Sequence, residues 1–271
     1  MLWDLRTSQL ARWDSRVYRH AMNILAFDTC FDACSVAVET CRAGGDRHVA
    51  SERIFMSLGH AEALMPMIAR VCSAAGVELA KLDRIAVTHG PGTFTGARIG
   101  IAAARALSLA LGVPVVSLSS LLPIGMAAVH RLPDCTRDRD AVIVARDARR
   151  DECYVEVVDP HGHSLTGPRL LTPQGAAALV PGHRLFATGS GAETVVAAAR
   201  AAGRDIVAED IGFAVPEHRE AEARWLLGFA HAAVPDARPP RPLYLRPPDA
   251  KPQSGKSIPR LVLPTKGTAG E

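Results

Sequence analysis

Apolar and polar residues along this chain follow a pattern that predicts short strands followed by helices. Apolar runs with the length of strands are separated by longer stretches in which apolar residues recur at helical spacing. The elements expected in the first half occupy residues 23–28, 34–39, 49–56, 60–75, 84–89, 96–111, 113–117 and 119–130. Three strands come first, so the predicted order is βββαβαβα.

The second half of the chain repeats this order in outline after a polar linker at residues 131–140. Its expected elements occupy residues 141–147, 153–158, 170–171, 173–179, 184–188, 192–202 and 220–232. Thr172 is expected to cap the helix that begins with Pro173. We therefore predict an α/β protein with two similar lobes, at residues 22–132 and 133–246. Packing of the last helix back on the first lobe is an arrangement that this order allows.

The two ends of the chain differ from the rest. Residues 1–21 carry Trp3 and Trp13 among arginines and acids, and they contain no apolar core of a signal peptide. Since Met22 directly precedes the first strand, we expect Met1 to be an upstream start, and a functional arm is the alternative. Residues 247–271 mix lysine, proline, glycine and serine, so we expect a basic, poorly ordered tail.

Composition narrows the class of protein. The 271 residues are 48% hydrophobic and 22% charged, with a formal net charge of +3, which is typical of a globular protein and does not predict nucleic-acid binding. The six cysteines have neither a CxxC pair nor zinc-like spacing. Every apolar run is broken by charged or turn-forming residues before it could cross a bilayer. We expect a soluble, cytoplasmic protein with reduced thiols.

A glycine-rich segment, Gly90-Pro-Gly-Thr-Phe-Thr-Gly-Ala-Arg98, joins a predicted strand to a predicted helix. Converging backbone N–H groups and the start of the helix could bind an anion there. A tight turn that needs glycine for its backbone conformation is an equal alternative. The segment has no GxxxxGK[ST] and does not match GxGxxG, so it is not a Walker A loop.

Catalytic constellations are sparse. The ten histidines contain no HxxxH and no HExxH, so we predict no metal site and no catalytic residues. Asp28 and Asp147 each end a strand in the manner of the phosphate-binding hairpins of sugar kinases and actin-like ATPases, but the turns after them lack glycine. Gly189-Ser-Gly191 could approach an adenosine, but we favour a turn into a helix as the explanation. A competent ATPase centre is not expected.

Both helices that flank the glycine-rich segment are apolar over more than one face. In the helix at 60–75 the apolar arc includes Leu64 and Ile68 and extends to Met65 and Cys72. Such helices must be covered on more than one side, either by the chain itself or by a partner. The pattern leaves a core role and an interface both open.

With these residues in view, the chain resembles the TsaB family of bacterial tRNA threonylcarbamoyladenosine biosynthesis proteins. The most specific match is the glycine-rich segment together with the preceding His60-Ala-Glu62. The other matching pieces are Ile24-Leu-Ala-Phe-Asp-Thr29, Leu82-Asp-Arg-Ile-Ala-Val87, Val115 to Ser120, Asp147-Ala-Arg-Arg150 with Tyr154, and Tyr244-Leu-Arg246. The resemblance covers nearly all of residues 22–250.

The resemblance implies a two-lobed actin-like fold, the one shared by hexokinase and the Hsp70 chaperones. It implies a noncatalytic subunit that binds the related catalytic subunit TsaD, joined by the ATPase TsaE, for transfer of a threonylcarbamoyl group to N6 of the adenosine beside the tRNA anticodon. TsaD carries a metal-binding histidine pair that this chain lacks. No cofactor of its own is implied, and a nucleotide at a subunit boundary and a homodimer both stay open.

In the resembled family, helices of the first lobe pack against TsaD or against a second TsaB. We therefore expect six residues of the two flanking helices to contact a partner, with small residues such as Ala102 and Ala104 allowing close approach. These interface candidates are Leu64, Met65, Ile68, Cys72, Ile101 and Arg105.

Two other classes of function remain as alternatives. The first is an independently active small-molecule kinase or metallopeptidase, which would need a catalytic constellation inside the chain. The second is a standalone tRNA-binding module, which the small net charge and the lack of interleaved basic and aromatic residues disfavour.

Overall fold

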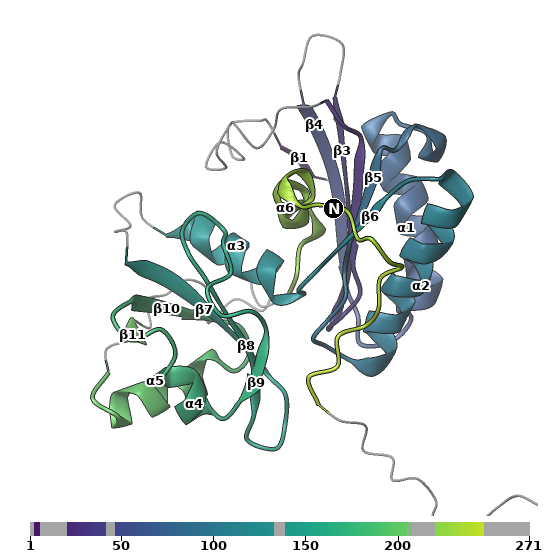
Figure 1. The fold of residues 1–271 in the computed structure, drawn as a ribbon. Coiled ribbons are helices and arrows are strands. Elements are labelled where there is room, and N and C mark those ends of the chain that lie inside the picture. Colours follow the sequence, from purple (N-terminus) through teal and green to yellow (C-terminus); the bar gives the residue numbers. More distant parts are fainter. Residues whose placement is uncertain are drawn as a thin grey trace, which may run out of the picture.

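The computed structural model describes residues 3–5, 21–41, 47–132, 139–204, 206–207 and 220–246, which form two lobes that each contain one β-sheet (Figure 1). The polar linker is described only at its ends, and residues 6–20 and the tail at 247–271 lie outside the described residues. Each lobe begins with strands that pair antiparallel and continues with parallel strands joined through helices.

The first sheet has the strand order β1-β4-β3-β2-β5-β6. Its strands are β1 (Trp3–Leu5), β2 (Ile24–Asp28), β3 (Ala33–Cys41), β4 (Arg47–Phe55), β5 (Arg84–Thr88) and β6 (Val115–Leu118). Strand β2 pairs antiparallel with β3, where Ala26 lies opposite Ala37, and parallel with β5, where Leu25 lies opposite Ile85. Strand β1 pairs antiparallel with β4 and forms one edge of the sheet.

One face of the first sheet is covered by helices α1 (His60–Ala75) and α2 (Phe94–Leu111), with a short 3-10 helix at Leu79–Lys81 between α1 and β5. Glycines 59 and 76 flank α1 in the left-handed conformation, which suits glycine at helix ends. The side chain of Thr93 caps α2 by accepting a hydrogen bond from the backbone N–H of Gly96. Helix α2 is long and apolar enough to cross a membrane by length and composition, which corrects the expectation that every apolar run is broken before that length, although core helices share this property.

The second sheet has the strand order β11-β10-β7-β8-β9. The elements of this half are β7 (Asp140–Asp147), β8 (Cys153–Val158), β9 (Arg169–Leu171), α4 (Pro173–Ala177), β10 (Arg184–Thr188), α5 (Ala192–Ala201) and β11 (Ile206–Val207). Helices α4 and α5 cover one face of this sheet.

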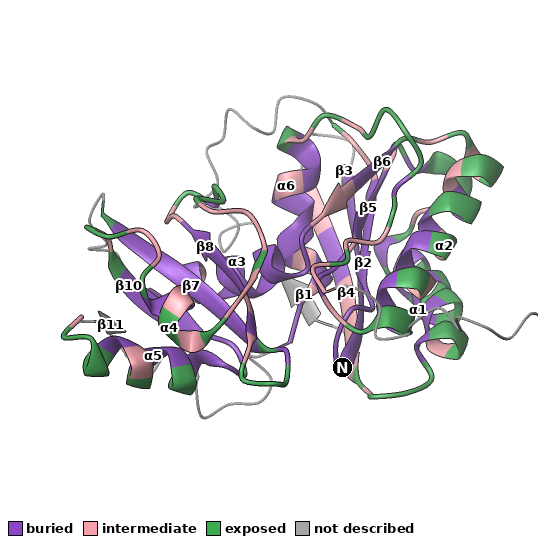
Figure 2. Cartoon of the chain, turned by 60° about the horizontal axis from the view of Figure 1, so that its bottom comes forward, coloured by how far each residue is buried: buried purple, intermediate pink, exposed green. Residues whose placement is uncertain are grey.

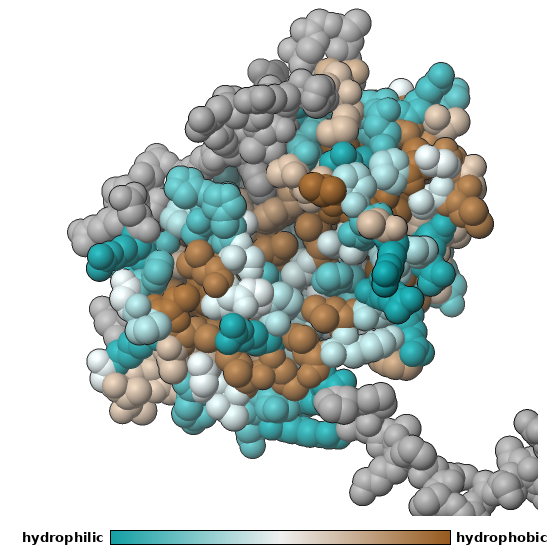
Figure 3. Space-filling view, in the orientation of Figure 1, coloured by the Kyte–Doolittle hydropathy of each residue, from teal (hydrophilic) through white to brown (hydrophobic). Residues whose placement is uncertain are grey.

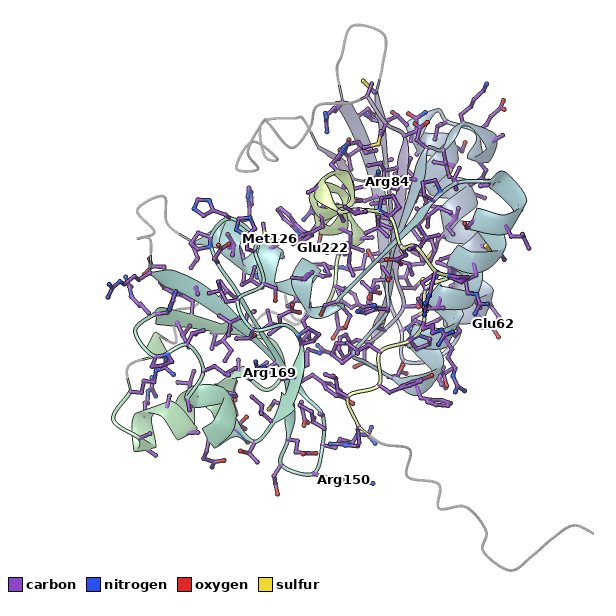
Figure 4. All side chains as sticks on the ribbon, in the orientation of Figure 1. Glu62, Arg84, Met126, Arg150, Arg169 and Glu222 are labelled. Carbon is purple, nitrogen blue, oxygen red and sulfur yellow. The ribbon has the colours of Figure 1, made fainter. Side chains whose placement is uncertain are left out.

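The two halves of the chain exchange their last helices. Helix α3 (Leu121–Arg131) follows β6 but packs on β7 and β8 of the second sheet, so closely that a Cβ on Gly125 would lie 2.9 Å from Val158. Helix α6 (Leu226–Ala232) packs on β2 and β5 of the first sheet. Arg84 of β5 holds the end of α6 by donating hydrogen bonds to the carbonyl oxygens of Ala230 and Ala233 (Figure 4). Each of these helices therefore packs on the sheet of the other half: α3 belongs to the core of the second lobe, and α6 to the core of the first.

The structure corrects the predicted elements at several places. Strand β1 lies within residues 1–21, which were expected to precede a folded domain that begins at Met22, and it pairs with β4 in the first sheet. Helix α2 begins at Phe94, two residues before the predicted start, because Thr93 is its cap. The last helix does not begin at residue 220: a 3-10 turn at Ala223–Trp225 precedes α6, and the backbone N–H of Ala223 is bound by the hydroxyl of Ser35. The short edge strand β11 had no prediction, because two residues are too few to establish a strand pattern.

Candidate functional site

A cleft of about 910 Å³ lies between the two lobes. The first lobe contributes a wall that includes Phe31, Phe55 and Thr93, and the second lobe contributes one that includes Arg149 and Tyr154. Figure 3 shows apolar and polar side chains side by side along the boundary between the lobes. The cleft is therefore the place where both halves of the duplicated fold could act on one ligand.

Arg146, at the end of β7, joins the two walls of this cleft. Its guanidinium lies 2.6 Å from the carboxylate of Glu220 and 4.3 Å from the ring centre of Phe31, in a pair whose side chains are nearly inaccessible to solvent. The second oxygen of Glu220 accepts a hydrogen bond from the backbone N–H of Asp32. Burial raises the pKa of Glu220, and the adjacent Arg146 opposes that shift. Arg146 and Glu220 thus form a buried ion pair at the cleft that connects the two lobes.

Asp28, the acid at the end of β2, is buried beneath the cleft and does not line it. One carboxylate oxygen accepts a hydrogen bond from the hydroxyl of Thr88 at 2.5 Å, and the other accepts one from the backbone N–H of Cys30. Burial raises the pKa of Asp28 from 3.8 to about 6, against the opposing effect of the Thr88 hydrogen bond. An acid covered in this way does not present its oxygens to a phosphate or a metal ion in the cleft.

The raised pKa of Asp28 gives a pH-dependent stability. A carboxyl that binds its proton more tightly in the folded chain than in the unfolded chain makes folding less favourable as the pH rises from about 4 to about 6, by up to about 3 kcal/mol for a two-unit shift. We expect Asp28→Asn to remove this contribution, so that urea midpoints of the variant change less across that range. The exposed Asp151→Asn is the matched control. Parallel curves for Asp28→Asn and the unsubstituted protein would contradict the raised pKa.

The glycine-rich segment packs tightly against the turn after β2. A Cβ on Gly92 would lie 2.4 Å from the carbonyl oxygen of Cys30, and one on Gly96 would lie 2.0 Å from that of Thr29. The backbone N–H of Thr93 donates a hydrogen bond to the Cys30 carbonyl at 2.8 Å. Of the two interpretations left open by the sequence, this geometry favours the tight turn over the anion cradle.

The corresponding turn of the second lobe, between β7 and β8, has an unusual backbone. Arg149, Arg150 and Asp151 all have positive φ, at 63°, 57° and 56°, a conformation that residues other than glycine seldom adopt. Asp147 supports the turn by accepting a hydrogen bond from the backbone N–H of Arg149 at 2.7 Å. Figure 4 labels Arg150 at the outer end of this turn. One oxygen of the Asp147 carboxylate thus supports the turn, while the exposed side chain lines the cleft.

Gly189 and Gly191, which the sequence offered as an approach to an adenosine, serve close packing instead. A Cβ on Gly189 would lie 2.3 Å from the carbonyl oxygen of Ala145, and one on Gly191 would lie 2.8 Å from the sulfur of Cys153. Ser190, between them, accepts a hydrogen bond from the backbone N–H of Asp147.

The six interface candidates separate into two groups. Leu64, Ile68, Cys72 and Ile101 are buried in the core between the two helices and the first sheet, each with 4% exposure or less. A partner could not reach these four side chains, so the expectation that they contact a partner is corrected. The apolar arcs of the two helices are broad because the sheet and the neighbouring helix both cover them. Met65 is 45% exposed and Arg105 is exposed.

The sides of α1 and α2 that face away from the sheet remain uncovered (Figure 2). We call a group of small and apolar exposed residues on these two helices, together with Arg105, the outer helix face, in which Leu109 is 88% exposed. The charged residues Glu62 and Arg70 of α1 and Arg98 of α2 are also exposed on these helices. The outer helix face comprises Ala61, Met65, Ala69, Ala102, Arg105, Ala106, Leu109 and Ala110.

Two features of the site escaped the sequence analysis. The pair of Arg146 and Glu220 joins positions 74 residues apart, and no local pattern connects them. Tyr244 and Arg246 were noted only as part of a resemblance, yet they contact both lobes beside the cleft. Among the described residues, no group of three or more histidine, cysteine or carboxylate side chains could hold a metal ion.

Comparisons with known proteins agree with this architecture. A crystal structure of a Pseudomonas aeruginosa protein described as similar to the peptidase YeaZ superposes with a TM-score of 0.65 at 30% identity, covering 83% of this chain and 100% of that one. YeaZ from Pseudomonas aeruginosa gives a TM-score of 0.60 at 29% identity, covering 77% and 91%. The family model described as "TsaD: tRNA N6-adenosine threonylcarbamoyltransferase" matches residues 55–203.

Sequence relatives are of two kinds. The Escherichia coli tRNA threonylcarbamoyladenosine biosynthesis protein TsaB is 35% identical over 133 residues, which are 49% of this chain and 53% of that protein. The match thus spans about half the length of this curated relative. An uncharacterized protein of Mycobacterium tuberculosis is 32% identical over 233 residues, covering 84% of this chain and 94% of that one.

Two lobes that begin with three strands each and exchange their last helices across a cleft define the actin-like class of α/β proteins. Within that class, the turn after β2 is packed closely by Gly92 and Gly96 of the glycine-rich segment. The chain belongs to the TsaB (YeaZ) family.

Proposed function

We propose that this protein is a noncatalytic subunit that binds TsaD for threonylcarbamoyl transfer to N6 of the adenosine beside the tRNA anticodon. The observation that carries the proposal is the outer helix face in a chain whose relatives include a tRNA threonylcarbamoyladenosine biosynthesis protein TsaB. An apolar surface on two neighbouring helices is typical of a protein interface. TsaE and tRNA would then act through the complex, in the cytoplasm.

The cleft supports the noncatalytic part of the proposal. Asp28 is covered and hydrogen-bonded, Asp147 is engaged by its own turn, and Arg146 is paired with Glu220. These three charged groups therefore all have partners within the chain, although Asp147 also lines the cleft. A kinase or peptidase acting alone would need groups that are free to meet a substrate.

The outer helix face supports docking of a structurally related partner. Ala102 and Ala106 lie one helical turn apart and would let a second helix approach closely, while Met65 and Leu109 offer apolar side chains at its borders. Since TsaD is related to this chain, the corresponding pair of TsaD helices is the proposed counterpart. A homodimer would use the same surface and would compete with TsaD.

Reconstitution tests the proposed function. Purified chain, its cognate TsaD and TsaE, and unmodified tRNA would be combined with the reaction's substrates, and the modified nucleoside would be measured with and without this chain. We expect modification to require both this chain and TsaD. Modification by this chain in the absence of TsaD would overturn the noncatalytic assignment.

Charge on the outer helix face should prevent association. We expect Leu109→Asp and Met65→Asp each to weaken binding to TsaD by about tenfold or more, because a carboxylate would be buried among apolar groups. Val234→Asp is the matched control, since Val234 is 86% exposed and lies outside this face. Binding would be measured by titration calorimetry with variants of equal melting temperature. Equal affinities for all three variants would exclude the outer helix face as the docking surface.

A further inference from the structure

The segment that follows α6 runs back along the first lobe and ends at the second. Asp236 attaches it to β6, because its backbone N–H donates to the carbonyl of Val115 and its carboxylate accepts two hydrogen bonds from Ser117. Further on, the backbone N–H of Leu243 donates to the carbonyl of His89 at 2.7 Å. Figure 1 shows this stretch in yellow, descending beside α2 toward the lower edge of the molecule.

Tyr244 fixes the segment to the first lobe. Its ring stacks on Phe94 with 5.6 Å between ring centres, and its hydroxyl accepts a hydrogen bond from Nε of Arg98 at 2.7 Å. The guanidinium of Arg98 lies 3.5 Å from the centre of the Phe94 ring. Gly90 allows the backbone to approach, since a Cβ there would lie 2.9 Å from the carbonyl oxygen of Leu243.

Arg246 fixes the same segment to the second lobe. Its guanidinium donates to the carbonyl of Ala148 at 2.8 Å and to the carboxylate of Glu152 at 2.5 Å. A longer hydrogen bond reaches the carbonyl of Arg149 at 3.3 Å. All three acceptors belong to the turn between β7 and β8, whose residues with positive φ were described above.

We propose that residues 243–246 form a clasp that holds the two lobes at a fixed separation along one edge of the cleft. The anchors Tyr244 and Arg246 are two residues apart, so their Cα atoms can be separated by at most about 7 Å. The lobes cannot move apart at this edge unless one anchor is released. The clasp touches both walls of the cleft. Arg246 donates to the carbonyl of Arg149, which lines one wall, and Tyr244 stacks on Phe94, the residue after Thr93 on the other wall.

The clasp also connects the cleft to the start of α2. Phe94 and Arg98, which hold Tyr244, occupy the first turns of that helix. Movement of the second lobe would therefore displace Tyr244 and disturb its contacts with the first turns of α2. This inference concerns the chain alone and does not depend on which protein binds it.

Hydrogen exchange and small-angle scattering of the full chain test the clasp. We expect Arg246→Ala and Tyr244→Ala to speed exchange about tenfold at the cleft-lining backbone of both lobes, residues 92–98 and 146–154, and to increase the radius of gyration. Arg241→Ala is the matched control, because Arg241 is an exposed arginine of the same segment. Tyr244→Phe keeps the ring and removes only the hydroxyl, so it provides a milder variant that retains the stacked core.

A variant in which the charges of positions 152 and 246 are swapped gives a further check. The double variant Arg246→Glu with Glu152→Arg should restore slow exchange only in part, because a glutamate at 246 can pair with the new arginine but cannot donate to the carbonyls of Ala148 and Arg149; each single reversal should restore none of it. Faster exchange confined to the turn at 148–152, with an unchanged scattering curve, would overturn the proposal, because it would mean that Arg246 merely supports that turn. Clasp variants that behave like Arg241→Ala would overturn it as well.

Discussion

Replacement of Gly96 by alanine is expected to destabilise the fold by about 3 kcal/mol or more, at the upper end of what overpacking usually costs. The added Cβ would lie 2.0 Å from the carbonyl oxygen of Thr29 and 2.6 Å from the hydroxyl of Thr93. The first contact is to backbone at the end of β2, which cannot turn aside as a flexible side chain would. The same contact region carries the hydrogen bond from the Thr29 hydroxyl to the carbonyl of Gly96. Urea unfolding would measure the loss.

Gly175→Ala provides the matched control. Gly175 also lies in a helix near its cap, but a Cβ there would meet its nearest neighbour, the hydroxyl of Thr172, at an ordinary 3.5 Å. We expect this change to leave stability within about 0.5 kcal/mol or to raise it slightly, because alanine favours helix over glycine. If the two alanine variants unfold at the same urea concentration, α2 does not pack on residues 29–30 as described.

Loss of Arg146 is expected to cost about 3–5 kcal/mol of folding free energy, since it would leave the carboxylate of Glu220 buried without its partner. We expect Arg146→Ala to unfold at much lower urea concentration than the unsubstituted protein. The effect should diminish at low pH, because burial already raises the pKa of Glu220 and protonation would remove the unpaired charge.

A double substitution separates the charge from the packing. Arg146→Met with Glu220→Leu removes both charges and keeps side chains of similar size, and we expect most of the stability of the unsubstituted protein to return. Arg53→Ala, which removes a pair with Glu222 at a less buried position, should cost less than Arg146→Ala. A double variant as unstable as Arg146→Ala would mean that Arg146 acts through packing on Phe31 and not through its charge.

Local patterns in the sequence predicted most of the elements. Helix α1 has the predicted limits because left-handed glycines stand at both of its ends, and Thr172 caps α4 through its hydroxyl as expected. Strand β8 likewise has the predicted limits, and β7 begins one residue earlier than predicted. These features depend on neighbours in the chain, and such neighbours are visible in the sequence.

Features that depend on distant segments were not visible. Leu64 and Ile101 carry the same apolar character whether a sheet or a partner covers them, so the sequence alone could not assign their burial. The exchange of α3 and α6 requires knowledge of which sheet each helix meets. The clasp depends on Tyr244 meeting Phe94, 150 positions earlier in the chain. In each case the decisive contact is tertiary and follows from the assembled fold.

The return of α6 to the first sheet has a consequence for how the protein is made. The face of that sheet formed by Ile24, Ala26 and Ala86 is covered by Leu226 and Leu227, which are translated about two hundred residues after β2. During synthesis, the first sheet therefore leaves the ribosome with one apolar face bare and stays so until nearly the whole second lobe has emerged. A nascent chain stalled before residue 226 should for that reason be a preferred substrate for chaperones, whereas one released after α6 should not.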